Sequence, residues 1–397
     1  MWCWNRWLVL AAAMLLVLSS GWLPQRKPAR SVATPGVTKS AILIGDSLPE
    51  SGPAASYGLT GGGAKAYFAY VNAHGGIYGR KLTLIALDDG YDPARTLANV
   101  KRLVLLNHVF ALLGVVGTAN NLTVLPFLTQ QGVPSVAALS GSSLLRQPFH
   151  KYLFPLIVTY TVEGRFLTDY AVHALHAKRI ALLYQDDAFG QEGLTAAKVR
   201  APKDGAALVA AAPYKVTDSD LSPQVLRLQH SGADAVIFFA IPSIVARFVS
   251  TAAKVGFHPA LLSSSVADDA TMLALLGPAG EGIYFDLWTP PLTAATPQVA
   301  LFRSIVAKYG NPVTAPPNLI TESGMAGAQV LVQALRRAGP SPTRAGLITA
   351  LEALRHWNGG LAFDVTYTPT EHSGALGIRM VRSHHGTFVP VAGPASR

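Results

Sequence analysis

Cysteine is almost absent from this chain of 397 residues: the only one, Cys3, lies before the first apolar run. The rest of the chain therefore carries no thiol, which excludes internal disulfides, a thiol nucleophile and cysteine-based metal sites. A lipid-attachment cysteine would have to follow the apolar run, so we expect no lipid anchor.

Charge is also scarce. Charged residues make up 14% of the chain, and 22 Asp and Glu stand against 32 Lys and Arg, a formal net charge of +10. Such a surplus would fit an acidic partner, yet no run of five or six basic residues and no basic stripe alternating with aromatics occurs. We therefore expect no nucleic-acid binding. Two interpretations stay open: an acid-poor surface, or a mild preference for anionic ligands.

A long apolar run occurs near the start of the chain, from Trp7 to Leu18, after one positive charge at Arg6. This pattern predicts a secretory signal peptide with its tail over residues 1–33, cleaved after Gly21 or after Ala33. The run is short for a membrane span, and an uncleaved membrane anchor is the alternative. We expect a periplasmic or otherwise extracytoplasmic protein.

From residue 41 onward, short apolar runs of strand length alternate with segments of helical period. Strands are predicted at 41–48, 81–88, 110–117, 133–139, 179–187, 206–214, 234–240, 259–265 and 282–288. Helices are predicted at 64–73, 93–107, 122–131, 162–174, 191–201, 221–230, 244–255, 299–309, 322–337 and 343–356. The order predicts an α/β fold with two doubly wound parallel-sheet lobes, each sheet buried on both faces.

The glycine-rich stretch SGPAASYGLTGGGAKA, residues 51–66, raises the question of a phosphate-binding loop. Gly58 and Gly63 have the required separation, but Lys65 comes one position late and no Ser or Thr follows it. We interpret the stretch as a strand-to-helix turn at the carboxyl end of the first strand, where open α/β sheets place their ligand crevice. Its glycines would allow close backbone approach and lobe closure, with Ser51 and Tyr57 facing the ligand.

Other catalytic patterns are weak. Asp88 and Asp89 are neighbours on a predicted strand, so their side chains point to opposite faces and cannot work as a paired acid and base. No Gly-x-Ser-x-Gly elbow is present. His173 and His176 share a helix face, but the sequence suggests no third ligand, so we interpret them as surface histidines. The sequence predicts no enzyme.

A family resemblance rests on seven segments taken together: SGPAASYG, VNAHGGIYGRKLTLIALDDGYDPA, LLGVVGT, QQGVPSVAALSGSS, EGRFLTDYAV, RIALLYQDDAFGQEGL and LQHSGADAVIFFA. In order and spacing, from about residue 42 to 391, they resemble extracytoplasmic solute-binding proteins of branched-chain-amino-acid-type ABC transporters, the leucine/isoleucine/valine-binding type.

The resemblance implies a periplasmic binding protein type I fold, with a hinge of three crossovers and lobes that close on a solute. It places lobe 1 at 40–158 plus 286–365 and lobe 2 at 159–285 plus 366–397. It also implies a monomer without cofactor, metal or chemistry that delivers a small carboxylate solute to an ABC permease in the inner membrane. A periplasmic ligand sensor that signals to a membrane receptor is the alternative.

Ligand contacts follow from the same resemblance. The turn before a helix at Thr118 and Ala119 matches the family position that binds a carboxylate, and a helix N-terminus favours an anion in any fold. Further matches or candidates are Leu139, Ser140, Ser143, Phe189, Tyr160, Tyr57 and Ser264. For the hydroxyl residues the structural alternative is helix capping, and for the aromatic residues it is core packing.

The sequence departs from amino-acid binders at two positions. Ile241 and Pro242 stand where a polar or aromatic contact is common, and Ser263–Ser265 stand where amino-acid binders offer a carboxylate to the ligand's ammonium. Burying an ammonium without a partner costs several kcal/mol. Asp268 and Asp269 come a turn later and would reach the ligand only if the loop is rearranged. The sequence therefore argues against an α-amino acid ligand, and a carboxylate without an amine, such as an aliphatic or aromatic acid, is a competing candidate.

Overall fold

The computed structural model describes residues 34–391. The predicted signal peptide, its two cleavage positions and Cys3 lie outside the described residues. None of the helices between residues 34 and 391 combines the length and the apolar character needed to cross a bilayer.

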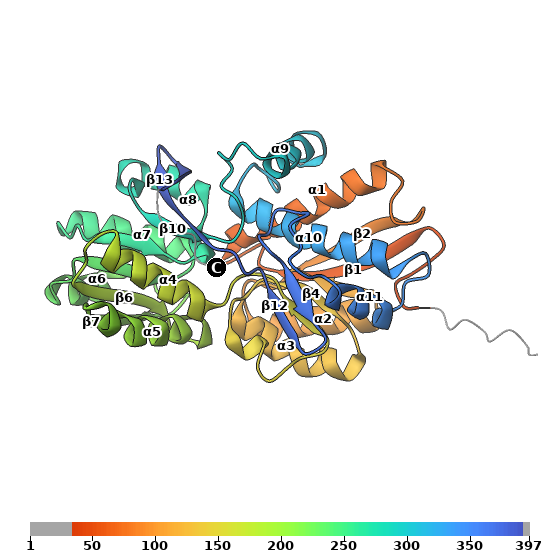
Figure 1. The fold of residues 1–397 in the computed structure, drawn as a ribbon, viewed down its shortest axis with the longest axis horizontal. Coiled ribbons are helices and arrows are strands. Elements are labelled where there is room, and N and C mark those ends of the chain that lie inside the picture. Colours follow the sequence, from red (N-terminus) through yellow and green to blue (C-terminus); the bar gives the residue numbers. More distant parts are fainter. Residues whose placement is uncertain (1–33, 392–397) are drawn as a thin grey trace, which may run out of the picture. The chain divides into compact units, whose positions relative to one another are not determined.

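Two parallel-stranded sheets form the cores of two lobes (Figure 1). The first sheet has five parallel strands in the order β2 (Lys81–Asp88), β1 (Ala41–Leu48), β3 (Ala111–Leu113), β4 (Ser135–Ala138) and β5 (Leu153–Pro155). Register pairs Ile44 of β1 with Leu84 of β2 and with Ala111 of β3. Ile44 is fully buried, as expected for a strand covered on both faces.

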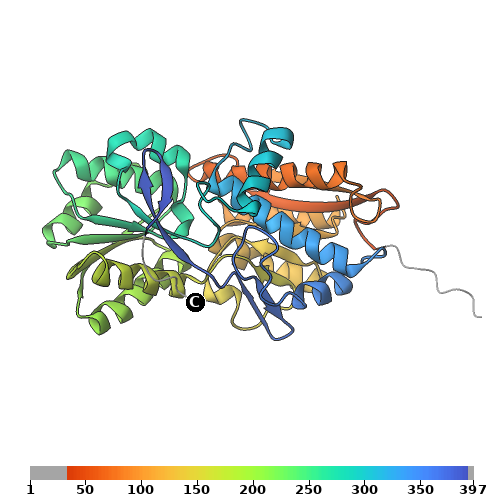
Figure 2. The ribbon, with the colours of Figure 1, turned by 45° about the horizontal axis from the view of Figure 1, so that its top comes forward.

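The second sheet has seven strands, in the order β14 (Thr387–Pro390), β13 (Arg379–His384), β10 (Tyr284–Leu287), β9 (Ala260–Ser263), β8 (Ala235–Phe239), β6 (Arg179–Gln185) and β7 (Ala207–Tyr214). The strands from β10 to β7 are parallel, whereas β13 and β14 form an antiparallel hairpin at the edge. The predicted doubly wound α/β fold is thereby confirmed, with helices on both faces of the seven-stranded sheet in Figure 2.

The helices connect the strands and cover the sheets. Lobe 1 contains α1 (Leu59–Ala73), α2 (Pro93–Leu105), α3 (Thr118–Gln131), α9 (Pro297–Tyr309), α10 (Leu319–Ala338) and α11 (Arg344–Glu352). Lobe 2 contains α4 (Tyr160–His173), α5 (Ala188–Arg200), α6 (Ser222–His230), α7 (Pro242–Lys254) and α8 (Ala270–Leu276). Short 3-10 helices are η1 (Ala55–Gly58), η2 (Ser143–Leu145), η3 (Ala201–Asp204), η4 (Ser265–Ala267) and η5 (Gly277–Gly280).

The chain passes between the lobes three times: after β5, after β10 and after a small hairpin of β11 (Thr366–Thr368) and β12 (Glu371–Gly374). Backbone hydrogen bonds join these crossovers. Ala375 N donates to Leu156 O at 2.7 Å, and Phe363 N donates to Trp288 O at 3.0 Å. The buried Arg146 guanidinium adds a third tie, because it donates to the carbonyls of both Ile157 and Ser373.

The expected lobe limits stay a proposal. Strand β10, Tyr284–Leu287, contains the limit at 286 and belongs to the seven-stranded sheet. The hairpin that begins at residue 366 lies beside lobe 1, since the Tyr367 hydroxyl donates to Pro155 O of β5 at 2.9 Å. Sheet membership thus favours crossovers slightly later than 286 and 366.

The glycine-rich stretch contributes to helix packing rather than to a loop. Helix α1 begins at Leu59, five residues before the expected start, so Gly61–Gly63 are helical. A Cβ on Gly62 would lie 1.6 Å from Thr314 O, and one on Gly63 would lie 1.9 Å from Thr321 O. The glycines therefore let α1 lie directly against α10 and the segment before it, within lobe 1 (Figure 1).

Candidate functional site

A cavity that is partly open to solvent lies between the two lobes. Fifteen residues from both lobes line it: Tyr57, Thr60, Tyr91, Val116, Gly117, Leu139, Ile157, Tyr160, Phe189, Ser265, Val266, Asp268, Trp288, Ile320 and Ser323. The lining contains no Lys, Arg or His, and most of it is aromatic or aliphatic.

Helix beginnings and strand ends place these side chains. Helix α4 begins at Tyr160 after its cap Thr159, and α5 begins just before Phe189 after its cap Asp187. The ring centroids of Tyr160 and Phe189 are 4.7 Å apart, and both side chains are buried. Parallel strands end at the same edge of a sheet, and the loops after them carry most of the lining, as is general in open α/β folds.

The N-terminus of α3 reaches the cavity through Gly117. Helices α4, α5 and α10 are capped by the side chains of Thr159, Asp187 and Asn318, whereas no side chain caps α3. Unsatisfied N–H groups and the helix dipole make such an end favourable for an anion. This end of the cavity is therefore suited to a carboxylate.

Gly117 has a structural reason to be glycine. Its φ is +97°, in the region that only glycine enters readily, and an added Cβ would lie 2.8 Å from the Tyr91 ring. The close approach of Tyr91 to the backbone thus depends on the missing side chain.

Asp268 is the one aspartate or glutamate in the lining, and it is 4% exposed. Burial raises its pKa well above the usual range, and repulsion from Glu322, Asp269 and Glu163 raises it further. No hydrogen bond from another residue within 34–391 engages its carboxylate. A buried carboxyl that is repelled by three neighbouring acids would gain most from a ligand that brings a positive charge or a strong donor.

The acids near Asp268 have different roles. Glu163 accepts a hydrogen bond from Ser265 Oγ at 2.5 Å. Asp269 caps α8 by accepting from Thr271 N at 2.8 Å, and it accepts from Asn318 Nδ2 of lobe 1 at 2.9 Å. The Asp269 carboxylate thus caps a helix and bonds to the other lobe, whereas the Asp268 carboxylate lines the cavity and is available to a ligand.

Several hydrogen bonds join the lobes around the cavity. The Tyr57 hydroxyl donates to Val266 O at 2.7 Å, and Ser243 Oγ donates to Pro53 O at 2.8 Å. The carboxylate of Glu192 on α5 accepts from Ser143 N at 2.8 Å. With the Asn318–Asp269 contact, these bonds hold the two lobes together.

The predicted site residues divide into two groups. Tyr57, Leu139, Tyr160 and Phe189 line the cavity. The second group does not line the cavity but lies within two residues of lining residues in the chain: Thr118, Ala119, Ser140 and Ser264. Of these, Thr118, Ser140 and Ser264 are buried. Thr118 Oγ1 lies 2.8 Å from Ser140 Oγ. The ligand-binding role of all eight residues stays a prediction.

Ser143 lies apart from the cavity. Its side chain is exposed, and it lines a surface hollow together with Thr161, Arg165 and Glu192. Ser51 is also engaged elsewhere, because its hydroxyl donates to Asp88 Oδ2 at 2.6 Å. With Ser51, the Gly90 and Glu50 amides and Arg95 as donors, the pKa of Asp88 falls to about 2, although burial alone would raise it.

Sequence reasoning missed much of the lining. The crossovers supply Ile157 and Trp288, and helix α10 supplies Ile320 and Ser323. Tyr91 comes from the loop after β2. Tyr91 could have been predicted, since it lies three residues after the end of a predicted strand in the first lobe. The residues on α10 could not be singled out in this way, because their sequence pattern is that of any buried helix.

Curated relatives share this sequence at low identity. The amino acid binding protein of Pseudomonas aeruginosa is 26% identical over 50% of this chain and 53% of its own length, so the alignment spans about half of that relative. The Leu/Ile/Val-binding protein homolog 3 of Brucella melitensis is 25% identical over 80% of this chain and 86% of its own length.

Solved structures agree with the fold. A substrate-binding periplasmic protein from Ralstonia solanacearum has a TM-score of 0.81 at 29% identity, over 88% of this chain and 99% of that one. Two others share the fold alone. One is a Thermus thermophilus branched-chain amino acid ABC transporter protein with bound valine (TM-score 0.83, 22% identity, 91% and 98% coverage). The other is a Thermomonospora curvata fatty acid ABC transporter substrate-binding protein (0.80, 24%, 90% and 93%).

The family model described as periplasmic binding protein matches residues 41–387, which include both sheets and all but the end of the edge hairpin. The two lobes joined by three crossovers agree with the fold that the family resemblance implies. The chain belongs to the periplasmic binding protein family, whose members are extracytoplasmic solute-binding proteins.

Proposed function

We propose that this protein is the exported substrate-binding component of an ABC importer, and that it delivers a small apolar α-amino acid to a membrane permease as a monomer. The family and the printed names of its relatives support the transport role. They leave the solute open, since one neighbour binds valine and another carries a fatty acid transporter name. The choice of an amino acid rests on the cavity.

The observation that carries this choice is the buried carboxyl of Asp268 in the cavity lining. The sequence raised doubt about an amine because serines replace the acid expected at 263–265. Asp268 compensates for that replacement: η4 (Ser265–Ala267) brings the chain around so that Asp268 lies at the cavity. A ligand ammonium would offset both the desolvation of this carboxyl and the repulsion from its acidic neighbours.

The ligand's carboxylate would bind at the uncapped N-terminus of α3. The amides of Thr118 and Ala119 lie in its first turn, and the paired hydroxyls of Thr118 and Ser140 offer further donors. Since no basic side chain lines the cavity, backbone and hydroxyl donors would hold the carboxylate. A zwitterion would then match both polar ends of the site.

The remaining walls suit an apolar side chain. Leu139, Ile157, Trp288 and Ile320 supply aliphatic and aromatic surface, with Tyr160 and Phe189 from lobe 2. Burying a side chain of leucine or phenylalanine size contributes about 1.5–3 kcal/mol. Ligand contacts from both lobes would shift the population toward closed lobes, the state that a permease would recognise.

Calorimetry with matched ligand pairs tests the proposal. Leucine, valine and phenylalanine are compared with isocaproate, isovalerate and hydrocinnamate, which are the same molecules without the amine. We expect at least one amino acid to bind about 100-fold more tightly than its partner, a difference of about 2.7 kcal/mol. Equal or tighter binding of the deaminated acids would refute the amino-acid assignment but not the binding role. Turnover of any ligand would refute the binding role itself.

A further inference from the structure

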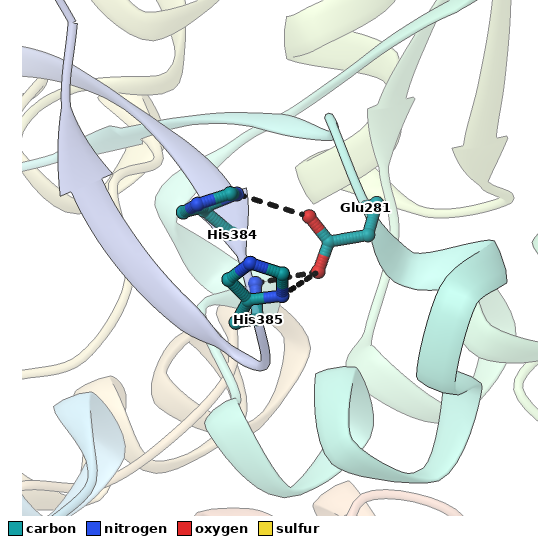
Figure 3. Close-up of side chains that lie close together, drawn as sticks. All are labelled: Glu281, His384 and His385. Atoms are coloured by element: carbon teal, nitrogen blue, oxygen red, sulfur yellow. Dashed lines mark hydrogen bonds and ion pairs between the residues drawn. The ribbon is translucent and has the colours of Figure 1, made fainter.

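Three side chains with metal-binding donors meet on the surface of lobe 2, and none of them lines the cavity. Glu281 follows η5, His384 ends β13, and His385 begins the turn to β14 (Figure 3). Their donor atoms all lie within 4.8 Å of one another. No sequence pattern indicates this cluster, because Glu281 is about a hundred residues away from the two histidines in the chain.

Each carboxylate oxygen of Glu281 faces a different imidazole. His384 Nδ1 is 3.3 Å from Glu281 Oε2, and His385 Nδ1 is 4.0 Å from Glu281 Oε1. Zinc bonds of about 2.0–2.2 Å in tetrahedral geometry place neighbouring donors about 3.3 Å apart. All three side chains are exposed, so small rotations would bring them to that spacing.

The backbone under the cluster is fixed by Ser383. Its hydroxyl donates to Gly280 O at 2.6 Å and accepts from Ile283 N at 2.8 Å, and its N–H donates to Ile283 O at 2.8 Å. These bonds join the loop that carries Glu281 to the strand residue just before His384. The donors are thus held near each other by buried structure rather than by chance contact of mobile side chains.

The conformation of His385 brings both histidines to one side. Neighbouring residues on a strand normally point to opposite faces, but His385 has a φ of +50°, which few residues other than glycine adopt. The two imidazole rings consequently lie 4.0 Å apart between centroids. The N–H of His385 also donates to Glu281 Oε1 at 2.5 Å and so orients the carboxylate, a kind of support that metal ligands commonly receive.

An ordinary surface ion pair does not need this arrangement. His356 with Asp364 at 2.8 Å and His173 with Asp204 at 3.5 Å are pairs of one histidine with one carboxylate. At Glu281 two adjacent imidazoles face a single carboxylate, and two imidazolium rings so close would repel each other. Two neutral imidazoles and a carboxylate form, in contrast, a favourable donor set for a transition metal ion.

We propose that Glu281, His384 and His385 bind one Zn²⁺ ion, with the remaining position taken by water. The donor set favours zinc over Mg²⁺ and Ca²⁺, which prefer oxygen ligands. The ion would join the end of the β13–β14 hairpin to the loop before β10, and so stabilise the edge of the seven-stranded sheet in proportion to its occupancy.

The test is a zinc titration of the full chain without an affinity tag, against a chromophoric chelator, combined with thermal unfolding. We expect one equivalent of Zn²⁺ to bind and to raise the melting temperature by a few degrees, with no shift from equal Mg²⁺ or Ca²⁺. The variants His384→Gln and His385→Asn should each weaken zinc binding at least tenfold; Asn is chosen at 385 because it tolerates positive φ.

The matched control is His356→Gln, which removes an exposed histidine of similar backbone conformation from a simple pair and should leave zinc binding unchanged. Binding of well under one equivalent, or equal affinity in wild type and both cluster variants, would overturn the proposal. Since Glu281 and the histidines do not line the cavity, amino-acid binding should persist in all three variants.

Discussion

The two walls of the cavity differ in the kind of polarity they offer. Lobe 1 presents Gly117 at the uncapped N-terminus of α3, which carries no charge, and the buried hydroxyls of Thr118 and Ser140 belong to the residues that follow Gly117 and Leu139 in the chain. Lobe 2 presents Asp268, a buried acid among other acids. On the proposed function, the first wall would hold the carboxylate of any ligand, whereas the second would distinguish ligands that carry an amine from those that do not.

This division suggests how one fold serves different solutes. The lobe 1 wall depends on backbone geometry, which the fold itself supplies, so it tolerates sequence change. The lobe 2 wall depends on one side chain and its loop, so a single replacement would change the class of ligand. Specificity for the amine is therefore expected to be separable from binding of the carboxylate.

The largest expected effect is that of Asp268→Asn. It should weaken binding of the best amino acid by about 100-fold or more, because a buried ammonium would lose its counter-charge. Calorimetry measures the loss. The matched control is Asp286→Asn, at a buried carboxyl that does not line the cavity, and a similar loss there would show that the effect is not specific to the site.

Gly117→Ala tests the other wall. The new Cβ would meet the Tyr91 ring at 2.8 Å and would carry the strain of a φ of +97°, about 1–3 kcal/mol. We expect affinity for amino acids and deaminated acids to fall by the same factor, about tenfold. Gly205→Ala has similar strain at φ +77° with nothing within 4 Å, so it should lower thermal stability without changing affinity. A loss confined to amino acids would contradict the assignment of this wall.

The pH dependence of ligand affinity distinguishes the two walls, because only the lobe 2 wall carries a titrating carboxyl. Because the pKa of Asp268 is raised in the empty protein, the carboxyl holds a proton below that pKa, and an ammonium ligand must displace it. Affinity for amino acids should then rise with pH, up to about tenfold per unit, and level off above the pKa. Calorimetry in buffers of different ionisation enthalpy should detect proton release. Release that persists in Asp268→Asn would assign the proton to another group.

The smallest effect is expected for Tyr57→Phe. It removes the hydroxyl that donates to Val266 O across the cavity, a hydrogen bond worth about 0.5–1.5 kcal/mol. All ligands should lose affinity by the same few-fold factor, since closure rather than specificity is affected. Tyr78→Phe removes an exposed hydroxyl that donates to Arg336 O and should leave affinity intact. Selective loss of amino acids would mean that Tyr57 contacts the amine.

The fold was largely predictable from the sequence because buried parallel strands give continuous apolar runs. Strands β1 and β2 coincide with the predicted 41–48 and 81–88. Strand β5 was missed because it has three residues within a proline-containing segment, and the β13–β14 hairpin because its polar residues resemble a loop. Helix α1 was placed too late since Gly61–Gly63 have low helix propensity, which tertiary packing against α10 overrides.

The site was less predictable than the fold. The family resemblance indicated Leu139 and Phe189, whereas position in the crossover and in the opening loop indicated Tyr160 and Tyr57; all four line the cavity. The sequence predicts that Asp268 reaches the ligand only if the loop after 263–265 is rearranged. The 3-10 helix η4 brings Asp268 to the cavity, and no sequence pattern indicates such a turn. The lining residues on α10 reach the cavity because the second segment of lobe 1 packs against the first segment. Such a contact between distant parts of the chain has no sequence pattern.

The most direct test of the amine assignment crosses the variant with the ligand. Binding of leucine and of isocaproate is measured to wild type and to Asp268→Asn, or the best-binding pair from the screen is used in their place. The account predicts that the substitution costs the amino acid about 100-fold and the deaminated acid less than about threefold, a coupling of roughly 2 kcal/mol or more. Equal losses for both ligands would contradict it, because the carboxyl would then not contact the amine.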